Sequence, residues 1–140
     1  MHAGRLPVVV GVDGSRSSLS ALRWGARQSQ LTGCPLRGVT AWHWPAAYGR
    51  VLSTIAFDLR ADTTELLSAV AEQLLAEFPE LVLEQLVAEG HPAEVLVEQS
   101  RDASLLVVGD RGRSAVLDMV LGSVAAHCIR QAACPVAVMR

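Results

Sequence analysis

The sequence predicts an α/β fold: an open, doubly wound sheet of five parallel strands in the order 3-2-1-4-5, with helices on both faces. Short apolar runs alternate with segments of helical periodicity along the chain, the pattern of parallel strands joined by right-handed helical crossovers. The first run is continuously apolar, as in strands buried on both faces. The chain has 140 residues, and we expect one domain over residues 1–140.

The first expected strand is residues 7–12, an apolar run typical of a buried parallel strand. An Asp-Gly-Ser turn ends it. Ser17 or Ser18 is the expected N-cap of a helix that runs through residues 19–31, and Gly33 closes that helix.

Residues 36–41 are the second expected strand. The segment 42–57 is aromatic at its start and lacks periodicity, so we expect a long loop there. Residues 58–78 have the apolar spacing of an amphipathic helix, and Pro79 ends it.

Residues 81–88 are the third expected strand. His91-Pro92-Ala93 opens the next helix, because proline suits a first helical turn, and this helix ends near Arg101. Residues 104–108 form the fourth strand.

A glycine-rich segment follows the fourth strand directly. Gly109, Gly112 and Gly122-Ser123 fall in the pattern G-x-x-G-x9-G-S, with a helix expected over residues 122–132 and the fifth strand over 135–139. Glycines let a backbone approach an anion closely, and a helix N-terminus offers free N–H groups at the positive end of its dipole. The spacing therefore predicts a phosphate-binding loop.

This loop differs from the two commoner phosphate loops. A Walker A loop needs lysine, whereas all 12 basic residues here are arginine, and the G-x-G-x-x-G fingerprint is absent after the first strand. In a sheet of this order, ligands bind at the carboxyl ends of strands one and four, beside the switch point. Asp13 ends strand one and Gly109 follows strand four, so topology and motif indicate the same place.

Composition argues against several classes of partner. A net charge of −2 and an aromatic content of 4% leave no basic stripe for nucleic acid, and no apolar run approaches the roughly 18 residues of a membrane span. The start of the chain lacks an apolar leader, and the three cysteines lack C-x-x-C spacing. We therefore expect a cytoplasmic protein with reduced, buried cysteines. The histidines are too scattered for a metal site, and the missing lysine and asparagine are typical of a GC-rich bacterial genome.

Three segments resemble the universal stress protein family: VVVGVDGSRSSLSALRWGA, HPAEVLVEQSRDASLLVVGDRGR and LGSVAAHCIRQAACPVAVMR. The resemblance covers essentially the whole chain except residues 42–57, and the complete glycine motif is similar to that of the ATP-binding branch. It implies an adenine nucleotide alpha hydrolase-like fold, a homodimer and a role in stress response or nucleotide-linked regulation. The implied ligand is ATP or another adenine nucleotide, with or without Mg²⁺.

The resemblance also implies roles for individual residues. Asp13 would contact the ribose hydroxyls, the backbone of residues 39–41 would hydrogen-bond adenine, and residues 122–124 would hold the β- and γ-phosphates. The full expected set is Asp13, Val39, Thr40, Ala41, Val108, Gly109, Gly112, Arg113, Ser114, Gly122, Ser123 and Val124. No catalytic or metal-ligating residue is expected among them.

Asp110 departs from the family pattern, which has a small uncharged residue there. A carboxylate facing a triphosphate would be repelled. We expect Asp110 to point to solvent or to pair with Arg111 or Arg113, and recruitment by Mg²⁺ is the alternative.

Three interpretations of function stay open. The first is an ATP-binding regulatory module: apart from Asp110 no general base is placed beside the phosphates, although slow hydrolysis stays open. The second is a related α/β enzyme that cleaves ATP to AMP and pyrophosphate, but such enzymes resemble S-G-G-x-D-S after strand one, where this chain has V-D-G-S-R-S. The third is a nucleotide-free dimerisation module, which the complete glycine motif disfavours. The unprotected edge of Pro135–Met139 is the expected dimer interface.

Overall fold

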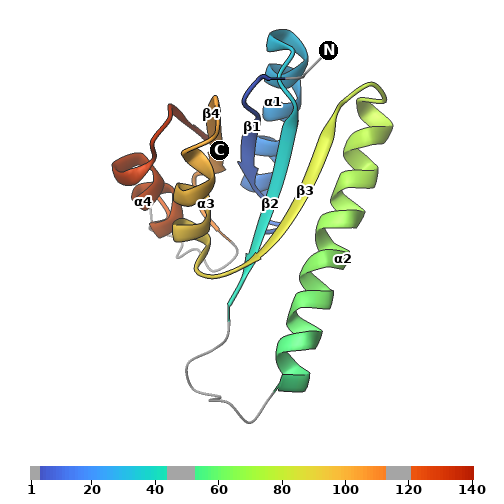
Figure 1. Ribbon diagram of the computed structural model, residues 1–140, viewed down its shortest axis with the longest axis vertical. Helices are drawn as coiled ribbons and strands as arrows, with labels where there is room; N and C mark the ends of the chain where they lie inside the picture. The colour runs from blue at the N-terminus through green and yellow to red at the C-terminus, as the bar shows by residue number, and fades with distance from the viewer. Residues whose placement is uncertain (1–3, 44–52, 113–120) are drawn as a thin grey trace.

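A parallel five-stranded sheet forms the centre of the molecule, in the predicted order β3-β2-β1-β4-β5 (Figure 1). The computed structural model describes residues 4–43, 53–112 and 121–140, and of residues 53–58 the backbone alone. The strands are β1 (Val8–Gly11), β2 (Leu36–Trp42), β3 (Leu83–Glu89), β4 (Leu105–Gly109) and β5 (Val136–Met139). Val8 of β1 pairs with Leu36 on one side and Leu105 on the other, so β1 is central.

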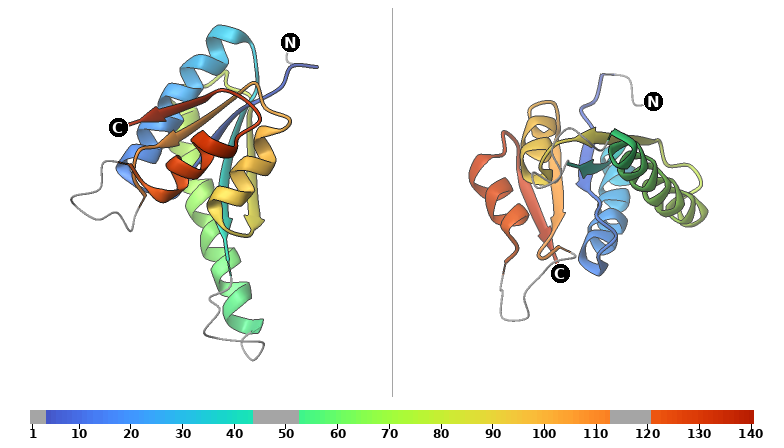
Figure 2. Two further views of the ribbon diagram at one scale, coloured as in Figure 1. Left: turned by 90° about the vertical axis from the view of Figure 1, so that its left-hand side faces the viewer. Right: turned by 90° about the horizontal axis from the view of Figure 1, so that it is seen from below.

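Helices cover both faces of the sheet (Figure 2). They are α1 (Arg16–Thr32), α2 (Ser53–Glu77), α3 (Pro92–Ser100) and α4 (Ser123–Gln131). One core packs against α1 and α2, and the other against α3 and α4. This is the predicted doubly wound α/β fold. Along the parts of the chain that the structure describes, no helix combines the length and the hydropathy needed to span a membrane.

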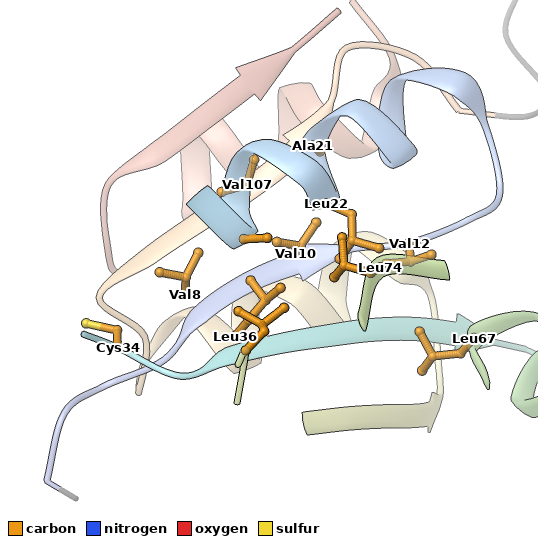
Figure 3. Close-up of a cluster of buried hydrophobic side chains, with 12 residues drawn as sticks. Val8, Val10, Val12, Ala21, Leu22, Cys34, Leu36, Leu67, Leu74 and Val107 are labelled. Atoms are coloured by element: carbon orange, nitrogen blue, oxygen red, sulfur yellow. The ribbon is translucent and has the colours of Figure 1, made fainter. Parts of the chain in front are cut away.

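The central strand is buried on both faces. Val8 and Val10 point into the core beneath α1, beside Leu22 (Figure 3). Val9 points into the opposite core, with Leu96 of α3, because successive side chains of a strand alternate between faces. The two cores account for the continuous apolar run at the start of the sequence.

The N-cap of α1 is Ser15, so the expectation of Ser17 or Ser18 is wrong. The Ser15 hydroxyl accepts from the Ser18 backbone N–H at 3.3 Å, and Ser17 and Ser18 are buried within the first turn. The cause is Asp13, whose Oδ1 accepts from the Ser15 N–H at 2.8 Å. This Asx turn starts the helix earlier. Gly33 closes α1 as predicted, in a left-handed conformation at φ 72°.

Helix α2 begins earlier than the sequence predicts. The helix begins at Ser53, so the loop predicted over residues 42–57 is wrong at its end, and Trp42 belongs to β2. Residues 44–52 of that loop lie outside the described residues. Figure 1 shows the N-terminal end of α2 extending past the sheet. A helical turn beyond the sheet needs no apolar stripe, so periodicity gives no sign of it.

Two of the three cysteines fit the predicted burial. Cys34 and Cys128 are buried and free. Cys134 is also free but half-exposed, so the expectation of burial is wrong for it. It lies in the connection just before the edge strand β5, where nothing in the described residues covers it fully.

Candidate functional site

A cleft of about 350 Å³ lies at the carboxyl ends of β1 and β4, at the predicted switch point. Most of the predicted site residues line it. They are Asp13, Val39, Ala41, Val108, Gly109, Gly112, Gly122, Ser123 and Val124. Segments far apart in the sequence therefore converge as the topology requires.

The remaining predicted residues are Thr40, Arg113 and Ser114. Arg113 and Ser114 lie outside the described residues. Thr40 is buried, 5% exposed, and is not among the residues that line the cleft. It shares the α2-facing side of β2 with Gly38, which lies against Leu67. The side chain of Thr40 is thus turned away from the cleft, and its backbone groups lie on the β3 side of β2, where the two strands pair. A backbone contact from Thr40 to adenine stays a prediction.

Further lining residues were not in the predicted set. They are Gly11, Val12, Ser15, Ser18, Pro92, Leu96, Arg111 and Ala125. One signal in the sequence points to part of this group: Pro92 opens α3 directly after β3, so it has to lie at the same carboxyl edge of the sheet. Together with Leu96 it gives the cleft an apolar wall.

The carboxylate of Asp13 is held by the turn that starts α1. Its Oδ1 accepts from the Ser15 N–H at 2.8 Å. Its Oδ2 faces Gly112, because a Cβ atom built on Gly112 would lie 3.1 Å from it. One oxygen is therefore fixed by the protein, while the other lies beside the glycine segment with lone pairs available to hydroxyl donors.

The motif glycines are required by close approach and not by unusual backbone angles. Among the described glycines, those with positive φ are Gly4, Gly14, Gly33 and Gly90, none of them in the motif. A Cβ atom on Gly109 would contact the Ser17 hydroxyl and lie 2.9 Å from the Ser17 carbonyl carbon. A Cβ on Gly122 would lie 3.1 Å from the Asp110 carbonyl oxygen. A side chain at position 109 has no room, and one at position 122 would require the backbone of residues 110–111 to shift.

The N-terminus of α4 opens onto the cleft. Its N-cap is Gly122, and no side chain caps the helix within the described residues. Gly122, Ser123 and Val124 all line the cleft. The N–H groups of a first helical turn without side-chain acceptors, together with the positive end of the helix dipole, suit an anion.

Few of the described residues around the cleft carry a charge. Arg111 is exposed and is the basic residue among the described lining residues. Asp110 does not line the cleft, and within the described residues it forms no ion pair with Arg111; pairing with Arg113 lies outside them. The backbone of Asp110 is engaged: its N–H donates to the Met139 carbonyl at 2.7 Å, and its carbonyl accepts from the Gly122 N–H at 2.5 Å.

Two histidines that are distant in the sequence come together near the cleft. The rings of His43 and His91 lie 4.7 Å apart between centroids. Across the described ranges, however, no group of three His, Cys, Asp or Glu side chains is arranged to hold a metal ion.

Comparison with known proteins identifies the family of the chain. The model of the universal stress protein family matches residues 5–140. The chain belongs to the universal stress protein family. Its curated relatives include a universal stress protein of Mycobacterium tuberculosis, 35% identical over 138 residues, or 95% of this chain and 47% of the relative. One of Mycobacterium bovis is 33% identical over 144 residues, or 94% of this chain and 47% of the relative. The chain thus spans about half the length of the curated relatives it matches.

Solved structures match the universal stress protein fold over nearly the whole chain. Universal stress protein UspA from Lactobacillus plantarum superposes with a TM-score of 0.85 at 18% identity, covering 96% of this chain and 97% of that one. A universal stress protein in complex with cAMP superposes with a TM-score of 0.74 at 27% identity, with coverage of 96% and 97%. A third, from Archaeoglobus fulgidus in complex with dAMP, has a TM-score of 0.62 at 22% identity, covering 96% and 98%.

Proposed function

We propose that this universal stress protein chain binds ATP in the cleft between β1 and β4 and acts as a nucleotide-dependent regulatory module in the stress response. The observation that carries the proposal is that three features line one cleft: the Asp13 carboxylate, the glycines after β4 and the uncapped N-terminus of α4. A relative that is 27% identical was solved with cAMP, which supports an adenine nucleotide as the ligand.

The adenine base fits the apolar end of the cleft, between Val39 and Val108 on the sheet and Leu96 of α3. The pairing of β1 with β2 ends at Val39, whose carbonyl accepts from the Val12 N–H at 2.8 Å. Alternate residues of a strand direct their backbone groups to the same neighbour. The N–H and C=O of Ala41 therefore point past the end of β1, where they offer a donor and an acceptor to the edge of the base.

The sugar and the phosphates fit the polar end. Oδ2 of Asp13 would accept from the ribose hydroxyls. The chain beyond Gly109 and Gly112 would follow the sugar and α-phosphate, and the first-turn N–H groups of α4 would bind the terminal phosphates. The guanidinium of Arg111 would add the positive charge that a triphosphate requires.

Titration calorimetry with ATP and with adenosine tests the proposal. Asp13→Asn keeps an oxygen for the Ser15 N–H but places an amide where the ribose needs an acceptor. We expect it to weaken both ligands alike by tenfold or more, as for a lost charge-assisted hydrogen bond worth about 1.5–3 kcal/mol. Asp62→Asn, a matched change at an exposed position of α2, should leave both affinities unchanged. Absence of ATP binding by the unmodified protein would overturn the proposal.

A further inference from the structure

The first turn of α1 is bonded to the segment that follows β4. The Ser17 hydroxyl donates to the Arg111 carbonyl at 2.7 Å, a contact between residues 94 positions apart. Ser17 is 8% exposed and lies against Gly109, where a Cβ atom would collide with its side chain. Arg111 and Gly109 line the cleft and Ser17 does not. Ser17 therefore supports the cleft from behind.

The same segment is held from its other side by α4. The Asp110 carbonyl accepts from the Gly122 N–H at 2.5 Å. A Cβ atom on Gly122 would lie 3.2 Å from the Arg111 Cα, so the N-cap of α4 packs directly on this segment. Asp110 and Arg111 thus lie between Ser17 on one side and the N-terminus of α4 on the other.

We propose that Ser17 is a positioning residue for phosphate recognition, an inference that rests on the proposed function. Its hydroxyl fixes the Arg111 carbonyl, and the Asp110–Arg111 segment in turn fixes where the first-turn N–H groups of α4 lie. Its hydroxyl proton is used by the Arg111 carbonyl, and the side chain lies outside the cleft, so it acts through the loop and not on the nucleotide.

Most of the groups expected to bind adenosine are held by other bonds, and the exception is the backbone of Gly109 and Gly112 beside the sugar. Asp13 is oriented by the Ser15 N–H, and the helix is capped by Ser15 through the Ser18 N–H. Ala41 is positioned by its strand, through the pairing of β2 with β3. Loss of the Ser17 hydroxyl should therefore weaken ligands with phosphates more than it weakens adenosine.

Ser17→Ala tests the proposal, because alanine fits beside Gly109 but donates no hydrogen bond. We expect ATP to bind about fivefold more weakly, the change that corresponds to one net hydrogen bond, and adenosine to bind within twofold of the unmodified protein. Without nucleotide, amide hydrogen exchange in residues 109–112 should be faster. Ser20→Ala, on the same helix and without a hydrogen bond from its side chain among the described residues, is the matched control and should change neither affinity.

The outcomes separate this inference from the function on which it rests. If the unmodified protein binds neither ATP nor adenosine, both are wrong. If it binds ATP and Ser17→Ala binds ATP equally well, the positioning role is wrong while the proposed function stands. Equal weakening of ATP and adenosine would also overturn the role, since Ser17 would then support the whole site. Ser17→Cys, of similar size but a weaker donor, should give the same selective loss if the alanine variant does not fold.

Discussion

Gly112 lies directly against the carboxylate of Asp13, so that a Cβ atom at position 112 would be 3.1 Å from Oδ2. The glycine segment after β4 and the acidic residue after β1 thus meet at one point of the cleft. The spacing is tighter than ordinary van der Waals contact, so any side chain at position 112 has to displace the carboxylate. The sequence motif and the acidic residue therefore form a single unit.

Valine substitutions in the motif should abolish ATP binding. In Gly112→Val the branched side chain would displace Asp13 and occupy the sugar side of the cleft. In Gly122→Val it would meet the Asp110 carbonyl, which is backbone and cannot rotate away. Gly112→Ala should give an intermediate loss, because one methyl group requires only a small shift of Asp13. Calorimetry measures the affinities and circular dichroism checks the fold. Full ATP affinity in both folded valine variants would remove the site assignment.

The parts of the fold that depend on many residues were predictable. Because the Val8–Gly11 strand is buried on both faces, its sequence is a continuous apolar run. The glycine spacing from Gly109 to Gly122 likewise indicates where the backbone approaches its neighbours closely. The parts that depend on one contact were not. The start of α1 is set by the hydrogen bond between Asp13 and the Ser15 N–H. The local sequence alone does not show which of the neighbouring serines is the N-cap.

The site was likewise predictable where it follows topology. Asp13 and Gly109 converge because the carboxyl ends of β1 and β4 flank the switch point. The contribution of Leu96 was missed because its periodicity indicates a core residue, which it also is. The hydrogen bond from Ser17 to the Arg111 carbonyl joins residues 94 positions apart, so no local sequence pattern predicts it.

Asp110→Ser should leave ATP affinity within about twofold, with or without Mg²⁺. The reason is that Asp110 does not line the cleft, and its structural contacts there are made by its backbone, which serine retains. Titrations of ATP and adenosine in EDTA and in Mg²⁺ measure this. Tighter ATP binding in EDTA, with adenosine unchanged, would mean that the carboxylate faces the phosphates. Weaker binding confined to Mg²⁺-ATP would mean that it holds the metal.

Cys128 should make the protein less stable in alkali. Burial, and next the charge of the neighbouring Cys134, raise the pKa of Cys128 from 9.0 to about 11. Below pH 9 both the folded and the unfolded chain keep this proton, so its contribution to stability is complete. Between pH 9 and 11 the unfolded chain loses the proton and the folded chain keeps it, so the free energy of unfolding falls as pH rises.

The expected fall is about 2–3 kcal/mol across that interval, at roughly 1.4 kcal/mol per pKa unit. Urea unfolding at pH 8 and at pH 11 measures it. Cys128→Ala leaves a cavity and should be less stable at both pH values. Its free energy of unfolding should, however, fall less between pH 8 and pH 11, because the thiol no longer contributes to the fall. Titrating groups that do not interact with Cys128 cancel in this comparison. Equal losses for the two proteins would show that Cys128 does not carry the dependence.

The outer edge of β5 should mediate formation of a homodimer. Among the residues that the structure describes, strand β5 pairs with β4 alone. The carbonyls of Pro135 and Met139 accept from β4 and from Asp110, so the backbone groups of Val136 and Val138, which alternate with them, point outward. An edge with unpaired N–H and C=O groups beside apolar side chains favours pairing with another chain. The same strand of a second copy would satisfy these groups about a two-fold axis.

Light scattering at micromolar concentration should therefore report about twice the chain mass of 14.9 kDa. Val138→Pro removes an outward N–H while leaving the hydrogen bonds between β4 and β5, and it should give a monomer. Gln85→Pro is the matched control, because it removes an outward N–H from β3 at the opposite edge of the sheet, and it should remain dimeric. Thermal unfolding identifies any variant that fails to fold. A monomeric unmodified protein, with and without ATP, would contradict the assignment, and dissociation by Gln85→Pro alone would place the interface at the other edge.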